Sequence, residues 1–295
     1  MSSIPTYAGL ISLPWADYEL IDTGNAQRLE RVGSFLVVRP ESTALWQPQD
    51  PSHKGWQNPD ARFIGTSKER LWDRAAGVPT KWPITWNNLT FEVGLTPFRH
   101  IGLFPEQQPQ WRWIQEKLAS RAKSDKPLRV LNLFAYTGLA SLAAAQMGAQ
   151  VCHVDSAKGS VYWASDNARA SALSETSIRW IVEDVRSFIA RELRRGSTYD
   201  LILMDPPVFG RGTKGEIWRL EDDLISLLRT TRQLFRPKPL GFLMNIYATT
   251  LYPYAIQRLV QDMYGDIFPT PSLSAVYIAQ SAGKTYLQTG FCLHS

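Results

Sequence analysis

The sequence RVLNLFAYTGLASLAAAQMGAQVCHVD, residues 129–155, decides the fold of the chain. It opens with a short apolar run, Arg129–Phe134, which has the composition of a buried strand, and a turn of small residues, Ala135–Gly138, follows. Leu139–Met147 consists mostly of Ala and Leu, which are strong helix formers. Val151–Asp155 is again apolar up to its last residue. The stretch therefore predicts a strand, a turn, a helix and a second strand.

The turn that ends at Gly138 has the features of a nucleotide-cofactor site. A glycine at the tip of a strand-to-helix turn lets the backbone approach a ligand, and the helix N-terminus offers unpaired N–H groups. Asp155 ends the second strand, where it can accept hydrogen bonds from ribose hydroxyls. An ordinary strand-turn-helix unit with an acidic residue after the next strand is the alternative, because only one glycine is present.

The same alternation of strands and helices continues to the end of the chain. It predicts an α/β fold with a seven-stranded Rossmann-like sheet, in which a closing hairpin around residues 281–284 adds one antiparallel strand. The five later strands are expected at Ile178–Glu183, Tyr199–Met204, Leu240–Tyr247, Leu273–Ala279 and Thr285–Leu293. The helices are expected at Trp111–Lys123, Leu139–Met147, Gly159–Leu173, Val185–Arg195, within Glu216–Arg232, and at Tyr252–Tyr264.

Residues 1–95 differ in character from residues 96–295. They hold short β-like runs with Pro and Gly between them, and six of the eleven Trp residues. We therefore expect a small β-rich domain at 1–95 and an α/β domain at 96–295. The Trp residues could stack on nucleic-acid bases beside neighbouring Arg residues, or they could form the core of the small domain. The clearest strand candidates are Tyr18–Ile21, Ser34–Arg39 and Leu89–Leu95.

Composition limits the class of protein. The chain has 295 residues, of which 44% are hydrophobic and 20% charged, as in ordinary folded proteins. Its two cysteines, Cys152 and Cys292, are too few for a disulfide framework and have no partner at metal-ligand spacing. We expect no metal and a reducing compartment. The N-terminus lacks the pattern of a signal peptide and no apolar run is long enough to cross a membrane, which favours the cytoplasm.

The net charge of +5 is unevenly distributed. Basic and acidic residues balance over the first hundred residues, and a basic cluster occurs at residues 112–129, including Lys123. Such a cluster could attract a polyanion such as RNA, whereas a solvated basic helix face is the ordinary explanation.

An irregular segment, residues 96–111, precedes the first strand of the α/β domain. Its prolines predict that it is not helical. Its polar and aromatic residues are typical of a loop that lines a substrate site, although a plain linker between domains would have a similar composition. The candidates for substrate contacts are His100, Phe104, Glu106 and Gln107.

Acidic residues also follow the third and fourth predicted strands. Asp184 could accept from the amino group of an adenine, and it could equally cap the following helix. Asp205-Pro206-Pro207-Val208-Phe209 forms a stiff turn at a carboxyl strand end, where α/β sheets hold ligands. The carbonyls around Pro206 and Pro207 could accept from a substrate amine, and Phe209 could stack on a planar base.

The next residues, Gly210–Gly215, match the pattern G-x-G-x-x-G. This pattern marks a dinucleotide site only between the first strand and first helix of such a fold, and Phe134–Gly138 already occupies that position. We expect a mobile cationic loop beside the substrate pocket instead. Arg211 and Lys214 would then be available for phosphates.

Several of these motifs occur together and in order in one known family. LNLFAYTG, VDSAKGSVYWASDN, the strand-end Asp184, DPPVF and GKTYLQTGF resemble the class I S-adenosylmethionine-dependent methyltransferases. The chain is most similar to the bacterial large-subunit ribosomal RNA methyltransferases, whose members include 23S rRNA cytosine-C5 enzymes. The resemblance covers residues 96–295, and HIGLFPEQ resembles the segment just before the first strand in that family.

The resemblance implies a set of cofactor and transfer residues. Asp155 would bind the ribose of S-adenosyl-L-methionine and Asp184 would lie near its adenine. Asp205 and Pro206 would form the transfer site. The methionine moiety would contact Phe134, Ala135, Tyr136 and Gly138.

The chain differs from the cytosine-C5 enzymes at one position that matters for chemistry. Those enzymes add a cysteine to the base, a form of covalent activation, and that cysteine follows the fifth strand. This chain has NIYATT, residues 245–250, at that place. Cys152 and Cys292 lie within predicted strands. We therefore predict that the protein does not form 5-methylcytosine by a covalent cysteine route.

The sequence as a whole predicts a methyltransferase that acts on RNA, at a nitrogen or another position that needs no covalent nucleophile. DPPVF is close to the N-methyltransferase pattern, in which the aromatic residue directly follows Pro-Pro. A methyltransferase for a small molecule or a protein side chain is the first alternative. A non-catalytic RNA-binding module of the same fold is the second.

Overall fold

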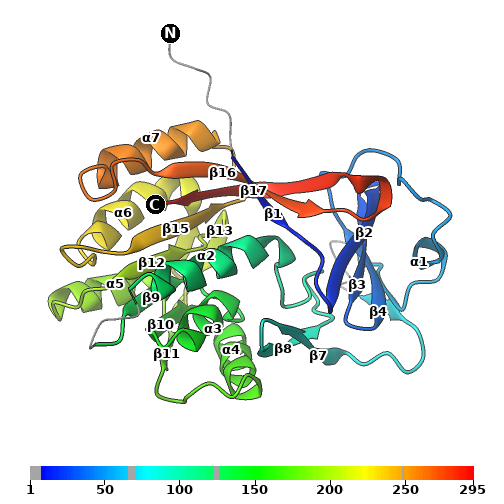
Figure 1. Ribbon diagram of the computed structural model, residues 1–295, viewed down its shortest axis with the longest axis horizontal. Helices are drawn as coiled ribbons and strands as arrows, with labels where there is room; N and C mark the ends of the chain where they lie inside the picture. The colour runs from blue at the N-terminus through cyan, green and yellow to red at the C-terminus, as the bar shows by residue number, and fades with distance from the viewer. Residues whose placement is uncertain (1–7, 66–70, 122–125, 248) are drawn as a thin grey trace, which may run out of the picture. The chain divides into compact units, whose positions relative to one another are not determined.

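The computed structural model describes residues 8–65, 71–121, 126–247 and 249–295 (Figure 1). It divides into two compact units. The first comprises the described residues up to Leu10, together with 109–276 and 290–295, and the second comprises 11–108 and 277–289. The sequence predicted a single boundary after residue 95. In the structure, residues 96–108 and 277–289 belong to the N-terminal unit as well.

The first unit is built on an eight-stranded sheet with the order β1-β16-β17-β15-β12-β9-β10-β11. Seven of its strands are the predicted ones, which confirms the α/β Rossmann-like fold, and β1 is an additional edge strand. Strands β11, β10, β9, β12 and β15 are parallel, and β17 is antiparallel to β15. The strands are β1 (Ala8–Ser12), β9 (Arg129–Leu133), β10 (Gln150–Asp155), β11 (Ile178–Val182), β12 (Leu201–Met204), β15 (Gly241–Ile246), β16 (Ser272–Ala279) and β17 (Tyr286–His294).

Helices cover both faces of this sheet (Figure 1). On one face α3 (Leu139–Gln146) packs on β9 and β10, and α4 (Lys158–Ala170) packs on β10 and β11. On the other face, residues of three neighbouring helices share one apolar core with the strands. These helices are α5 (Val185–Arg194), α6 (Leu220–Arg232) and α7 (Pro253–Tyr264).

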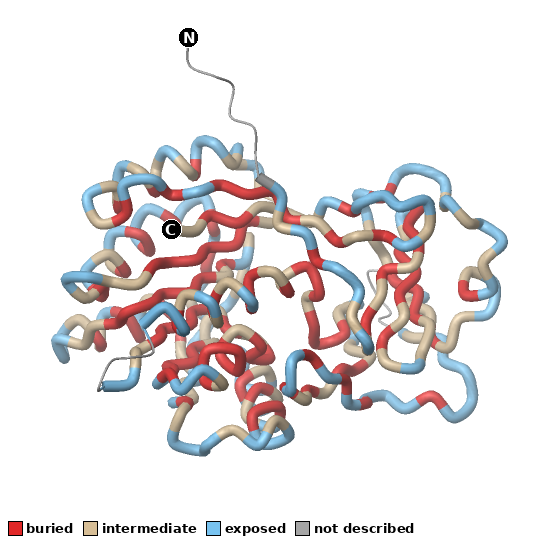
Figure 2. The backbone as a smooth tube through the Cα atoms, viewed as in Figure 1, coloured by how far each residue is buried: buried red, intermediate tan, exposed pale blue. Residues whose placement is uncertain are grey.

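The central strands are apolar without alternation because both of their faces are covered. Every residue of β12 and of β15 is buried, and Figure 2 shows this burial running through the middle of the sheet. Side chains still point alternately to the two helix layers. Leu131 and Leu133 therefore belong to the core with α5–α7, whereas Asn132 faces α3.

The segment before β9 contains helices, so the expectation of an irregular loop at residues 96–111 was wrong in part. A short 3-10 helix, Pro105–Gln107, leads directly into α2 (Gln108–Ala119). Pro109 lies in the first turn of α2, where the N–H that proline lacks has no helical partner in any case. Residues 122 and 123 of the predicted helix, and thus Lys123 of the basic cluster, lie outside the described residues.

The segment after β12 also differs from expectation. The predicted cationic loop is an antiparallel hairpin of β13 (Phe209–Arg211) and β14 (Ile217–Arg219), and α6 begins at Leu220.

The second unit contains a five-stranded sheet in the order β2-β3-β4-β5-β6 and a separate hairpin, β7-β8. Asn25-Ala26 and Asn87-Asn88 have positive φ angles and connect hairpins, as in primed two-residue turns. The elements are β2 (Tyr18–Gly24), β3 (Gln27–Val32), β4 (Phe35–Pro40), α1 (Lys54–Gln57), β5 (Ala61–Phe63), β6 (Trp72–Arg74), β7 (Lys81–Trp86), β8 (Leu89–Gly94) and the 3-10 turn Ala282–Lys284.

The Trp residues of this unit are structural, although not all are core residues. Only Trp82 and Trp86 are buried, and Trp46 is 43% exposed. The indole N–H groups of five of the six donate within the unit, to Thr85 O, Thr23 O, Asp22 Oδ2, Thr96 O and Val32 O. These bonds hold the indoles in place and account for the Trp residues without a nucleic-acid ligand.

The carboxylate of Asp22 joins distant segments of the second unit. It is fully buried and accepts from the backbone N–H groups of Gln49 (3.1 Å) and Asp50 (3.0 Å) and from the indole of Trp56 (3.1 Å). It also accepts from Nε2 of Gln280, at 3.0 Å and 258 residues away in the chain. The tip of the C-terminal hairpin thereby becomes part of the N-terminal unit.

A second buried carboxylate, Glu30, lies at the centre of an ionic cluster. It accepts from the Tyr18 hydroxyl (2.7 Å) and from Nη2 of Arg39 (2.9 Å), and Nε of Arg28 is 3.6 Å away. Burial alone would raise the pKa of Glu30, but Arg28 and Arg39 hold it below its usual range. Loss of this carboxylate would leave two buried guanidinium groups without their central partner.

No helix among the described residues combines the length and the hydrophobicity that crossing a membrane requires.

We expect Glu30→Gln to destabilise the second unit by about 3–5 kcal/mol, because it leaves buried cations uncompensated. Urea unfolding followed by Trp fluorescence measures this change. Glu92→Gln is the matched control, since Glu92 pairs with Lys81 at the surface and should cost less than about 1 kcal/mol. Because the pKa of Glu30 is lowered on folding, its contribution is present above the unfolded value of about 4.3 and is lost as pH falls. Equal effects of the two substitutions at neutral pH would contradict this account.

Candidate functional site

The turn between β9 and α3 is the most strained part of the first unit. Phe134 (φ 57°), Tyr136 (φ 49°) and Gly138 (φ 92°) all have positive φ, and the first two carry bulky side chains. Such residues cost on the order of 1–3 kcal/mol each and persist only where their surroundings hold them. The N–H of Ala135 donates to Val154 O at 3.1 Å, which ties the turn to β10.

Gly138 is required by close packing as well as by its φ angle. A Cβ atom at this position would lie 2.8 Å from Cβ of Ala164 in α4 and 3.3 Å from Leu142. The glycine therefore lets α3 begin directly against α4. Nδ2 of Asn167 in α4 donates to Thr137 O at 3.0 Å, which fixes the same turn from the α4 side.

The carboxylate of Asp155 holds two strand ends together. Its Oδ2 accepts from the N–H of Tyr136 and its Oδ1 from the N–H of Ala157, both at 2.8 Å. Burial raises the pKa of Asp155, and these two N–H donors oppose that rise. Each oxygen has a further lone pair, so the carboxylate can still accept from a diol.

A buried polar network links the elements on either side of the turn, β9 and α3, with β10. Nδ2 of Asn132 donates to Ser141 Oγ at 2.9 Å, and Ser141 Oγ lies 3.0 Å from His153 Nδ1. The three residues come from β9, α3 and β10. Burial lowers the pKa of His153 to about 3, so the imidazole is neutral and the network carries no charge.

Asp184 caps α5, which confirms the capping role, one of the two roles predicted for it. Its Oδ1 accepts from the N–H groups of Arg186 (3.0 Å) and Ser187 (3.2 Å), and its Oδ2 accepts from the Arg186 guanidinium at 3.2 Å. Arg186 also pairs with Asp223 of α6 at 3.0 Å. Most of the hydrogen-bonding capacity of Asp184 is therefore used within the protein.

The turn after β12 lies beside the turn after β9. The N–H of Asp205 donates to Leu133 O at 3.2 Å. The indole of Trp218 donates to Pro207 O at 2.6 Å, so that carbonyl is occupied, contrary to the expectation that both proline carbonyls are available. The Pro206 carbonyl has no donor within the part of the chain that the structure describes.

The β13-β14 hairpin connects these parts. Its Trp218 is 3% exposed and packs against Phe134, with 4.9 Å between ring centroids. Oγ of Ser156, just after β10, donates to Arg211 O at 3.1 Å. A Cβ on Gly212 would lie 3.0 Å from Oδ2 of Asp184. The hairpin thus lies along the carboxyl ends of β9, β10 and β11, and its Arg211 and Lys214 side chains are exposed.

The other predicted substrate residues belong to the second unit. Glu106 is buried, and burial raises its pKa although Arg28 opposes the rise. Burial and nearby Arg39 lower the pKa of His100 to about 4, and its ring lies 5.4 Å from that of Phe104. Gln107 ends the short 3-10 helix. Any contact of these four residues with substrate remains a prediction.

Neither cysteine is exposed. Cys152 is 4% exposed and Cys292 is fully buried. Burial raises the pKa of Cys152 to about 11, and burial together with the charge of Asp205 raises that of Cys292. Both thiols are therefore protonated at neutral pH, which makes them poor nucleophiles.

Three residues of this edge were not singled out from the sequence. Trp218 and Ser156 anchor the hairpin, and only the folded chain brings them to it. Asn245, in β15, is 3% exposed, and its Oδ1 has no hydrogen-bond partner among the described residues. The sequence signal that could have drawn attention to Asn245 was a single polar residue in an otherwise apolar strand.

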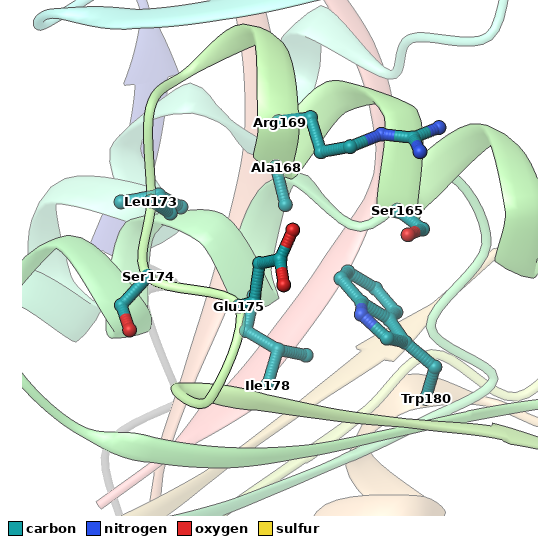
Figure 3. A pocket seen from close by; sticks show the side chains of 8 residues that line it. All are labelled: Ser165, Ala168, Arg169, Leu173, Ser174, Glu175, Ile178 and Trp180. Carbon is teal, nitrogen blue, oxygen red and sulfur yellow. The ribbon is translucent and has the colours of Figure 1, made fainter.

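A hollow with a volume of about 240 Å³ lies at the opposite end of β11 (Figure 3). Ile178, at the start of β11, pairs with Val151 at the start of β10, so this hollow is at the amino ends of the strands. Glu175 and Trp180 border it. It is separate from the Phe134–Gly138 turn, at the carboxyl ends.

A family model for S-adenosylmethionine-dependent methyltransferases matches residues 65–253, which is more than half of the chain. The chain belongs to this family. The crystal structure of such a methyltransferase from Agrobacterium tumefaciens is 39% identical, with a TM-score of 0.91 over 99% of this chain and 93% of that one. A methyltransferase-like structure from Streptococcus mutans is 19% identical, with a TM-score of 0.70 over 94% and 75% of the two chains, and supports the fold alone.

A curated relative is named ribosomal RNA large subunit methyltransferase K/L, from Magnetococcus marinus. It is 32% identical over 231 residues, which are 72% of this chain and 31% of the relative. The chain thus spans less than a third of that relative's length.

The family is named for its use of S-adenosylmethionine, and the turn at Gly138 fits this group. The glycine leaves no side chain between α3 and α4, and Asp155 keeps acceptor capacity for a diol. The described residues bring together no group of His, Cys, Asp or Glu that could hold a metal ion.

We expect Gly138→Ala to weaken binding of S-adenosylhomocysteine by at least about tenfold, because the added Cβ forces α3 and α4 apart at the turn. Titration calorimetry measures this affinity. Gly196→Ala is the matched control, since Gly196 also has a positive φ (64°) but nothing within 4 Å of its added Cβ. Its affinity should stay within about twofold of the wild type. Equal losses in both variants would show that the close approach to Ala164 is unimportant.

Proposed function

We propose that this methyltransferase modifies ribosomal RNA. The Pro206 carbonyl carries the proposal, because it is an acceptor with no donor among the described residues and lies at the carboxyl edge, next to the strained turn. The name of the curated relatives and the basic excess of the chain support RNA as the substrate. Since ribosomal RNA is cytoplasmic in bacteria, the cytoplasm is the corresponding location.

In this proposal the cofactor lies along the ends of β9, β10 and β11. Asp155 accepts from its ribose hydroxyls, and Asp184 with its remaining lone pair lies near its adenine. The methionine moiety contacts the turn residues Phe134, Ala135, Tyr136 and Gly138.

When bound, the cofactor supplies a methyl group on a sulfonium, which is transferred by in-line displacement. The protein then has to align the acceptor and manage its proton. Asp205 and the Pro206 carbonyl accept from an exocyclic amine, Pro207 stiffens the turn, and Phe209, which is 52% exposed, stacks on a planar base of the substrate. Arg211 and Lys214 bind phosphates. His100, Phe104, Glu106 and Gln107 are further candidates for substrate contacts.

A nitrogen acceptor agrees with the state of the cysteines. Cytosine C5 needs a thiolate adduct, whereas both thiols here are buried and protonated. We therefore infer chemistry without a covalent protein adduct.

Mass spectrometry of nucleosides from ribosomal RNA tests the substrate. A strain that lacks the gene should lose one methylated nucleoside other than 5-methylcytosine, and the wild-type gene should restore it. Unchanged ribosomal RNA beside loss of methylation in a metabolite or a protein fraction would replace this proposal with a different substrate class.

Two substitutions separate cofactor binding from transfer. Asp205→Ala should lower kcat by at least about 100-fold with binding of S-adenosylhomocysteine unchanged, because it removes an acceptor at the transfer site. Asp155→Ala should weaken that binding at least about tenfold, because the diol and two backbone N–H groups lose their acceptor. Radiolabelled methyl transfer and calorimetry measure the two effects. Cys152→Ser is the control and should keep kcat within about threefold. Binding that Asp155→Ala leaves unaltered would refute the cofactor assignment.

A further inference from the structure

The β13-β14 hairpin has two chemically different faces. Its register pairs Phe209 with Arg219, Gly210 with Trp218, and Arg211 with Ile217. Paired residues in an antiparallel hairpin share a face, and successive residues alternate between faces. Gly210 and Trp218 therefore form one face, which we call the inner face. The outer face consists of Phe209, Arg211, Ile217 and Arg219.

The inner face is fixed to the methyltransferase sheet. Trp218 is buried against Phe134 and donates to Pro207 O. Gly210 lies close to the same turn, because a Cβ there would be in ordinary van der Waals contact with Pro207, at 3.4 Å. The N–H of Leu220 also donates to Val208 O at 3.0 Å, which closes the base of the hairpin. The outer face is therefore held at a fixed position relative to the Pro206 carbonyl.

The outer face is exposed and combines apolar with cationic side chains. Phe209 is 52% and Ile217 50% exposed, and both arginines are exposed. Across the described ranges, neither the Arg211 nor the Arg219 guanidinium has an ion pair, and neither does the ammonium of Lys214 at the tip. Arg186 and Arg191 nearby, in contrast, each pair with carboxylates. Exposed apolar side chains beside unpaired cations are typical of a binding surface for a polyanion with planar groups.

Three acidic residues next to the hairpin accept hydrogen bonds within the protein, whereas Asp222 at the start of α6 is exposed. Glu216 accepts from the backbone N–H of Lys214 at 2.8 Å. Asp223 accepts from the N–H of Arg219 and pairs with Arg186. Glu221 accepts from Thr249 and Thr250. These bonds turn Glu216, Asp223 and Glu221 toward the protein backbone and neighbouring side chains, so the three cations of the hairpin outnumber the one carboxylate beside it, Asp222, for which no contact is seen among the described residues.

We propose that the outer face binds the unpaired nucleotides that flank the methylated base. Arg211 and Arg219 contact backbone phosphates, and Phe209 and Ile217 contact base faces. The bases of a duplex are stacked and paired, so only a single strand can present a base face to Phe209. Because Phe209 follows Pro206 by only three residues, a base at the Pro206 carbonyl brings its neighbours to this hairpin. This inference deepens the proposed function and rests on RNA being the substrate.

Fluorescence anisotropy with a labelled, unstructured 20-nucleotide RNA tests the proposal on the full-length protein. Arg211→Ala/Arg219→Ala should weaken binding by about tenfold at low salt and lower the slope of log K against log salt by about 1.4, which is 0.7 per phosphate contact. Phe209→Ala should weaken binding with the slope unchanged, because stacking releases no counterions.

Arg194→Ala/Arg229→Ala is the matched control, since both arginines are exposed and lie at the ends of α5 and α6. It should bind the RNA within about twofold of the wild type. Binding of S-adenosylhomocysteine should be unchanged in every variant, because Trp218 and the inner face are kept. A parallel loss of cofactor affinity would overturn the separation of the two faces.

The remaining outcomes distinguish this inference from the function on which it rests. If the wild type binds the RNA but the hairpin variant equals the control, the outer face is not the binding surface and the proposed RNA substrate stands. If the wild type binds no RNA, both proposals fall. If the Arg211→Ala/Arg219→Ala variant loses as much affinity for a 20-base-pair duplex as for the single-stranded RNA, the preference for a single strand is overturned.

Discussion

The carboxylate of Asp155 forms the interactions on which the carboxyl edge of the sheet depends. It accepts from the N–H of Tyr136, which follows β9, and from the N–H of Ala157, which follows β10. It thereby joins the strained turn after β9 to the end of β10. Burial makes the ionised carboxylate costly and thereby raises the pKa of Asp155. A cofactor diol that donates to the same oxygens would offset part of that cost. Strain and burial that weaken the empty protein can thus be turned into affinity.

Much of the fold could be predicted from the sequence because its central strands are buried on both faces and appear as unbroken apolar runs, such as Leu201–Met204. The strand, turn and helix around Gly138 were equally predictable, whereas the binding of a cofactor at that turn remains a prediction. The β13-β14 hairpin was not, because its strands have three residues each and a loop-like composition. Its stability comes from Trp218 packing on Phe134, a contact between distant parts of the chain that no local pattern contains.

Trp218 also illustrates why the site was only partly predictable. The motif Asp205-Pro206-Pro207 indicated acceptor carbonyls, but not that the indole would occupy that of Pro207. One tryptophan thereby restricts the available acceptor to Pro206, supports the cofactor turn through Phe134, and sets the position of the hairpin. Similarly, Asn245 was visible only as a polar residue in an apolar strand until its unpaired oxygen was located.

The Asp22 carboxylate has a consequence for biosynthesis. Its partner Gln280 is 258 residues away, so the N-terminal unit cannot complete its polar core until residue 280 has been translated. Most of the β-rich unit leaves the ribosome before the α/β unit, yet it acquires this buried hydrogen bond only after residues 109–276 of the α/β unit have been synthesised. Such non-local closure slows folding and exposes the incomplete unit to chaperones and proteases in the meantime. Completion of the polar core of the N-terminal unit therefore depends on prior synthesis of the α/β residues that lie between its two segments.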